Sequence, residues 1–152
     1  MYMKKVSLTG LLMALLFIAQ AHVLRGRPVL ERAIQNFSRD YKGALGADWT
    51  PLKEGGYVCR FTLDGVAGKA FYDKRGRWQS TVAGYTESRM PRAVRRLVLT
   101  NYYDYKILYV HEITMVGKAT VFQVQVRDAH VIKVLRVADD QVEEIRELEA
   151  TD

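Results

Sequence analysis

Side chains that could bind a metal or act in catalysis are few and widely separated in this sequence. Its three histidines are His22, His111 and His130. None of them pairs with another at i,i+4 or stands at a metal-binding spacing from a carboxylate, and a histidine metal site needs several ligands that converge. We therefore expect no metal and no cofactor, and we expect His111 to be an ordinary strand residue.

Nucleophilic and acid–base chemistry are also poorly supported. Cys59 is the single cysteine, so no disulfide forms within the chain, and its place on the apolar side of a strand indicates a buried thiol. The adjacent carboxylates Asp139-Asp140 and Glu143-Glu144 are expected to point apart or to lie in a turn, as solvated charges that make a poor acid–base pair. The sequence contains no glycine-rich phosphate loop and no serine in a nucleophile elbow. We predict a protein that is not an enzyme, with an active site assembled only by folding as an alternative.

The charge pattern indicates a solvated surface. The chain has 23 basic and 17 acidic residues, a formal net charge of +6, and the two signs are interspersed. Such a pattern does not favour nucleic-acid binding. Four arginines in and before the second predicted helix, Arg89, Arg92, Arg95 and Arg96, provide an alternative in which that helix binds anionic lipid or polysaccharide.

Aromatic residues are the best candidates for a binding surface. The chain has nine Tyr, five Phe and two Trp, and tyrosine is common both at core edges and at interfaces. Core packing remains the alternative for each ring taken singly. The predicted partner-binding face consists of Tyr57, Trp78, Tyr103, Tyr105 and Tyr109.

Two helices and a series of strands must position these side chains. Apolar residues alternate with polar ones in 57–63, which predicts a strand, and Asp64-Gly65 predicts a tight hairpin turn after it. Helical spacing of apolar residues predicts helices over 29–41 and 91–103. Further strands are predicted at 47–53, 67–73, 77–84, 106–115, 119–127, 130–137 and 141–146.

The two helices end in matching tripeptides, which suggests an internal repeat. Asp40-Tyr41-Lys42 recurs as Asp104-Tyr105-Lys106, and the apolar positions of the two helices superpose at the same offset. A fixed offset indicates a duplicated unit. The predicted fold class is α+β, a tandem repeat of a helix plus three to four antiparallel strands. The two helices would pack on one face of a shared curved antiparallel sheet.

The N-terminus has the features of a signal peptide. Lys4-Lys5 precede an apolar run over 11–19, and Ala19-Gln20-Ala21 supplies the small residues that signal peptidase requires. The run is shorter than the ~20 residues of a membrane span. We predict a signal peptide at 1–21, a periplasmic or secreted location, and no stable membrane span after cleavage. Residues 22–152 would form a single domain of two repeats, at about 28–86 and 87–147.

The chain resembles a known family, the PepSY-like proteins, which are also described as beta-lactamase-inhibitor-like. The resemblance is carried by Ala70-Phe71-Tyr72-Asp73, Gly76, Trp78, Met90-Pro91 and 102–106. Met90 stands where the family usually has leucine. The resemblance implies a secreted, non-enzymatic, tandem-repeat α+β protein of the bacterial envelope.

These observations together predict an exported binding module without enzymatic activity. It would present the open face of its sheet to a protein or peptide partner in the cell envelope, and the sequence does not identify that partner. An unpaired edge strand leaves edge-to-edge association open, so the oligomeric state stays undetermined.

Overall fold

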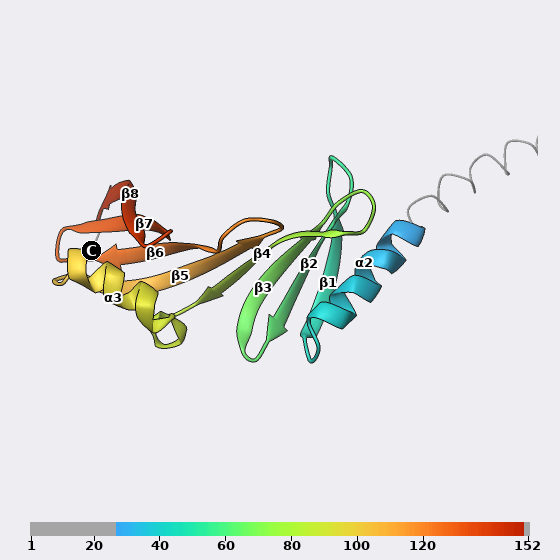
Figure 1. Ribbon diagram of the computed structural model, residues 1–152, viewed down its shortest axis with the longest axis horizontal. Coiled ribbons are helices and arrows are strands. Elements are labelled where there is room, and N and C mark those ends of the chain that lie inside the picture. Colours follow the sequence, from blue (N-terminus) through green and yellow to red (C-terminus); the bar gives the residue numbers. More distant parts are fainter. Residues whose placement is uncertain (1–26, 151–152) are drawn as a thin grey trace, which may run out of the picture.

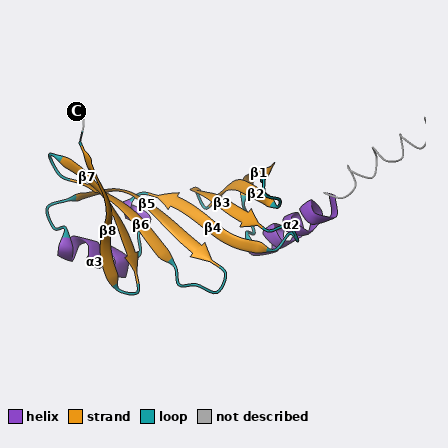
Figure 2. Ribbon diagram, turned by 90° about the horizontal axis from the view of Figure 1, so that it is seen from above, coloured by secondary structure: helices purple, strands orange, loops and turns teal. Residues whose placement is uncertain are grey.

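The structure, a computed structural model, describes residues 27–150. Its strands form a single eight-stranded antiparallel sheet in which strand order follows the chain from β1 to β8. The sheet runs along the long axis of an elongated molecule (Figure 1), and it is strongly twisted when seen from above (Figure 2). The signal peptide predicted at 1–21 lies outside the described residues.

Two α-helices interrupt or precede the strands. Helix α2 spans Arg27–Asp40, and α3 spans Arg92–Asn101 after a short 3-10 helix, η1, at Glu87–Arg89. The strands are β1 (Leu45–Pro51), β2 (Tyr57–Leu63), β3 (Val66–Tyr72), β4 (Trp78–Tyr85), β5 (Lys106–Met115), β6 (Val121–Arg127), β7 (Val131–Ala138) and β8 (Gln141–Glu149).

Tight turns connect several of the hairpins. Asp64 and Gly65 join β2 to β3 with φ values of 50° and 76°, which confirms the predicted turn. Asp139 and Asp140 join β7 to β8, also at positive φ, and both side chains are exposed. Short polar side chains tolerate this backbone region, which is strained for most other residues. Asp139-Asp140 are therefore turn charges, as predicted.

The predicted fold class, an α+β tandem repeat with two helices packed on one face of a shared sheet, is wrong. Strands β4 and β5 pair continuously from Ser80–Met115 to Tyr85–Val110, so the eight strands form one sheet without a division into two units. The sheet makes up most of the regular structure. The helices lie near opposite ends of the long axis (Figure 1). Ala33 and Phe37 of α2 and Val94 and Val98 of α3 are the buried core residues among their described side chains.

Residues matched by the predicted repeat also have different environments. Tyr41 contacts Phe61 at 4.7 Å between ring centroids, and its hydroxyl hydrogen-bonds to that of Thr81. Tyr105 instead stands edge-on to Tyr102, at 5.5 Å between ring centroids, beside the buried residues around α3. The repeated tripeptide therefore does not mark two equivalent structural units.

Buried side chains form two separate clusters. The α2 cluster joins Ala33 and Phe37 of the helix to four strand residues, Cys59, Phe61, Ala70 and Tyr72. The Phe37 ring lies 5.1 Å from Phe61 and 5.6 Å from Trp49. The α3 cluster joins Val94 and Val98 to eight further residues, Tyr85, Met90, Ile107, Val110, Val124, Val126, Leu135 and Val137.

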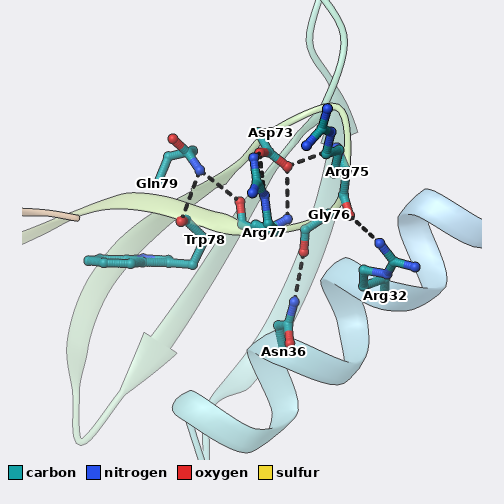
Figure 3. Close-up of polar contacts among 8 residues, drawn as sticks. All are labelled: Arg32, Asn36, Asp73, Arg75, Gly76, Arg77, Trp78 and Gln79. Carbon is teal, nitrogen blue, oxygen red and sulfur yellow. Dashed lines mark hydrogen bonds and ion pairs between the residues drawn. The ribbon is translucent and has the colours of Figure 1, made fainter. Parts of the chain in front are cut away.

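The turn between β3 and β4 anchors helix α2 (Figure 3). The Asp73 carboxylate accepts hydrogen bonds from the backbone N–H groups of Arg75 and Arg77, at 2.8 and 2.9 Å, and it pairs with the Arg77 guanidinium at 2.9 Å. The Asn36 side-chain amide donates to the Gly76 carbonyl at 2.8 Å. The Asp73 contacts order the turn, and the Asn36 bond holds the second half of α2 against it.

Candidate functional site

Strand register divides the sheet side chains into two faces. Residues directly opposite each other on neighbouring strands point to the same face. Cys59 of the α2 cluster lies opposite Trp49 and Ala70, and following these pairings through the sheet defines the core face. All strand residues of both clusters belong to it. We call the other face the open face.

The middle of the open face is apolar. Val82, Ile113 and Val121 lie opposite one another on β4, β5 and β6. Phe71 and Met115 continue this region through their common neighbour on β4, Ser80. All five apolar side chains are half-buried. We call Phe71, Val82, Ile113, Met115 and Val121 the apolar centre.

Charged strand residues of the two faces differ in sign. The open face carries six basic residues on described strands, Arg60, Lys69, Lys106, Arg127, Arg136 and Arg146, and two acidic ones, Asp48 and Glu143. The core face carries four acidic residues, Glu112, Glu144, Glu147 and Glu149, and one basic residue, Lys133. The open face is therefore the basic side of the sheet.

Ion pairs on the open face are long, whereas those on the core face are short. Arg60 lies 3.7 Å from Asp48, and Arg136 lies 3.7 Å from Glu143. On the core face, the Lys133 ammonium lies 2.7 Å from the Glu147 carboxylate and 2.9 Å from the Glu144 carboxylate. Hydrogen bonds to these two carboxylates, that of Glu147 first, raise the pKa of Lys133.

Four basic residues of the open face have no ion pair within residues 27–150. They are Lys69, Lys106, Arg127 and Arg146. Three of these side chains are exposed, and Arg127 is half-buried. Their charges are available to a ligand.

A hollow of about 260 Å³ lies between Val82 of the apolar centre and the basic residues in the middle of β2 and β3. Its polar lining includes Arg60, Lys69 and His111. The Tyr109 ring stands edge-on to His111 at 5.0 Å. A Cβ at Gly84 would overlap the Tyr109 hydroxyl, so glycine lets this ring lie across β4. The hollow can receive one polar or charged side chain.

The structure does not bring the five predicted aromatic residues together. Trp78 lies on the core face, where its indole N–H donates to the Thr81 hydroxyl at 2.8 Å. Tyr105 packs against the α3 cluster. Tyr57 is half-buried at the start of β2 and also has core-face register.

The remaining two predicted residues are more accessible. Tyr103 lies in the turn between α3 and β5 and is 83% exposed. Tyr109 is the one member of the predicted set with open-face register. The basic residues and the apolar centre were missed because the prediction followed aromatic content. The alternation within each strand could have indicated the basic residues of the open face. In β2, for example, Arg60 and Thr62 stand between apolar neighbours and therefore point to the face opposite to theirs.

The basic helix surface has a partner within the described chain. Arg95 forms an ion pair with Glu87 at 2.6 Å, whereas Arg92 and Arg96 are exposed beside Met90 and Leu99. Part of the positive charge predicted for anionic lipid or polysaccharide is thus neutralised.

Groups for other chemistry are sparse across residues 27–150. Burial raises the pKa of the Cys59 thiol to about 11, and nearby Asp48 adds to the effect. The thiol is therefore protonated at neutral pH and is a poor nucleophile. No three His, Cys, Asp or Glu side chains of this region gather closely enough to hold a metal ion. In the same region, no helix has both the length and the apolar character required to cross a membrane.

Comparison with solved structures identifies proteins of similar fold. A protein from Bacteroides eggerthii described as periplasmic is 16% identical, with a TM-score of 0.61, and the match covers 78% of this chain and 86% of that one. A DUF2874 family protein from Bacteroides uniformis is 19% identical, with a TM-score of 0.61, covering 78% and 87%. A BLIP-like protein from Bacteroides fragilis is 18% identical, with a TM-score of 0.63, covering 80% and 86%.

These matches assign the chain to a fold shared with BLIP-like and DUF2874 proteins. At such identities the likeness concerns the fold alone. No protein-family model matches the sequence, and no curated protein matches it.

Proposed function

We propose that this protein is an exported, non-enzymatic binding module that presents the open face of its sheet to a protein or peptide in the cell envelope. The observation that carries the proposal is the open face itself. It has an apolar centre and unpaired basic residues, and neither buried cluster of the described chain extends onto it. An antiparallel sheet can leave one face to water, and an apolar patch with a polar rim is typical of an interface.

The comparisons give this proposal indirect support. One protein of similar fold is described as BLIP-like, a label that denotes likeness to an inhibitor protein, and another is described as periplasmic. The periplasmic description agrees with the location predicted from the leader. Membership of the PepSY-like family in particular stays a prediction, and fold likeness alone does not establish inhibition of any enzyme.

Site-specific photocrosslinking tests the proposal directly. A photoreactive amino acid replaces Ile113 or Gln123 on the open face, and Ala93, exposed on α3, provides the control position. The cells that produce the protein are irradiated, and the adducts are identified by mass spectrometry. We expect both open-face positions to yield one and the same adduct that the control position lacks. The purified pair should then bind in isothermal titration calorimetry.

Two results would refute the proposal. One is the absence of any adduct at both open-face positions in cells that contain the folded, exported protein. The other is an identical set of adducts at all three positions, because that pattern reports random collision rather than a binding surface.

A further inference from the structure

The open face has an ordered distribution of charge that bears on the chemistry of its partner. This inference rests on the function proposed above and specifies its ligand. Arg60 and Lys69 lie on β2 and β3, at one end of the apolar centre. Arg136 lies on β7, beyond its other end. The apolar centre is thus flanked by basic residues on both sides along the sheet.

We propose that the open face binds an acidic polypeptide segment in which carboxylates flank a short apolar stretch. The apolar residues of the segment would cover Val82, Ile113 and Val121. Its carboxylates would pair with the basic residues at the two ends. Charge complementarity of this kind fixes the register and orientation of a partner more than it sets affinity.

Strand spacing sets the separation of the two carboxylates. Lys69 on β3 and Arg136 on β7 are four strand positions apart in the sheet. With neighbouring strands about 4.8 Å apart, they are separated by about 19 Å across the face. An extended chain advances about 3.3 Å per residue, so acidic residues about six positions apart match this span.

The hollow beside Tyr109 is a binding site for one of these two carboxylates of the partner segment. Its lining includes the charged or polar residues Arg60, Lys69 and His111 beside apolar ones such as Val82, and its volume of about 260 Å³ exceeds that of a glutamate side chain. Arg60 has only a 3.7 Å ion pair with exposed Asp48, so a carboxylate in the hollow competes with a weak internal partner. Surface pairs of that kind contribute little.

Polypeptide fits this face better than a polyanion does. A sulfated polysaccharide or an anionic membrane presents charge without apolar groups spaced to cover Ile113 and its neighbours. A second copy of this chain is also disfavoured, because Glu144 and Glu147 of its acidic β8 are already bound to Lys133 on the core face.

Fluorescence anisotropy with a designed peptide tests the inference. The labelled probe has two glutamates about six positions apart with leucine and valine between them, matching the span derived above. One control peptide has lysine at the two acidic positions, and the other has serine at the apolar positions. We expect the probe to bind the full folded domain, binding to weaken as salt rises, and both control peptides to bind at least about tenfold more weakly.

Matched charge-reversal variants locate the contact. Lys69→Glu removes a basic residue of the open face, whereas Lys42→Glu makes the same change at an exposed position after α2. Lys69→Glu should weaken probe binding at least about tenfold, and Lys42→Glu should leave it unchanged. Circular dichroism and thermal unfolding verify that both variants fold. Equal losses in the two variants, or equal binding of the lysine peptide, would overturn the inference.

Failure of the inference is distinguishable from failure of the proposed function. Phosphatidylglycerol vesicles and dextran sulfate are titrated beside the probe. If they bind through Lys69 and the peptide does not bind, the ligand is a polyanion and the inference is wrong. If open-face crosslinking yields one specific protein while the acidic peptide does not bind, the inference is wrong and the binding module stands.

Discussion

Substitution of Gly76 by alanine tests whether α2 depends on its close contact with the β3–β4 turn. Gly76 has φ of +74°, and a Cβ built there would lie 2.6 Å from the Val29 carbonyl oxygen and 3.0 Å from the Ala33 nitrogen. Both are backbone atoms of α2, which cannot move aside as the end of a flexible side chain can. Gly76→Ala must therefore displace the helix.

The expected cost has two parts that a control variant separates. A residue with a Cβ at positive φ costs about 1 to 2 kcal/mol. Displacing α2 also weakens the hydrogen bond from Asn36 to the Gly76 carbonyl, worth about 1 kcal/mol, and disturbs the packing of Phe37. We expect Gly76→Ala to lower the free energy of unfolding by about 3 to 4 kcal/mol. Gly117→Ala, at φ of +67° with nothing within 4 Å of the new Cβ, should cost only about 1 to 2 kcal/mol.

Urea unfolding followed by tryptophan fluorescence is the appropriate assay. Both tryptophans, Trp49 and Trp78, pack against the α2 cluster, so their fluorescence reports on the region that the substitution disturbs. Free energies are obtained by linear extrapolation to zero urea. A difference between the two variants below about 0.5 kcal/mol, the usual scale of an innocuous surface substitution, would refute the argument, because the contact with α2 would then contribute nothing beyond the cost of the backbone conformation.

Three further predictions concern titratable side chains. The buried Tyr72 hydroxyl has no hydrogen-bond partner within residues 27–150, so Tyr72→Phe should leave thermal stability unchanged or raise it, whereas Tyr85→Phe removes a 2.6 Å bond to the Glu112 carboxylate and should cost about 2 kcal/mol in urea unfolding. Partial burial would raise the pKa of Asp73, but hydrogen bonds from the Arg77 and Arg75 backbone and the Arg77 side chain lower it overall. The ionised Asp73 carboxylate thus stabilises the folded protein at pH values above its unfolded pKa of about 3.9, and this contribution is lost as pH falls through its lower pKa in the folded state. In acid unfolding curves, the stability advantage of the wild-type protein over Asp73→Asn should therefore shrink below about pH 4. Cys59, whose burial raises its pKa to about 11, should react with Ellman's reagent only after unfolding, and rapid reaction of the native protein would contradict the structure.

Local signals predicted most individual elements. The alternation of apolar and polar residues predicted β2 at the bounds that the structure shows, and the strand over Lys106–Met115 was predicted equally well. The helix predictions were correct to within a few residues at each end. These successes depend on neighbours in sequence, such as the Asp64-Gly65 turn, whose backbone preference is a local property.

Arrangement of the elements depended on contacts that no local pattern contains. The matching tripeptides at 40–42 and 104–106 suggested duplication, yet Tyr41 is fixed by Phe61 and Thr81 whereas Tyr105 lies beside the buried residues around α3. Sequence similarity over three residues did not determine these distant partners. The five predicted aromatic residues lie in different environments for the same reason. Whether a ring such as Trp78 is packed or exposed depends on which other elements cover its strand.

The difference in charge between the two faces of the sheet could not be predicted from the sequence of any single strand. Alternation within β3 separates Lys69 from Ala70, and alternation within β7 separates Lys133 from Val134, but neither strand alone tells which of its two sets lies on the side of the buried clusters. The register between neighbouring strands determines the face of each side chain. Lys69 lies opposite Val82 on the open face, whereas Lys133 lies opposite Glu147 on the core face. A shift of one residue in any single pairing would exchange the faces beyond it. The basic open face is therefore a property of seven successive strand pairings, and a variant that alters one pairing should lose acidic-peptide binding even where every basic residue is retained.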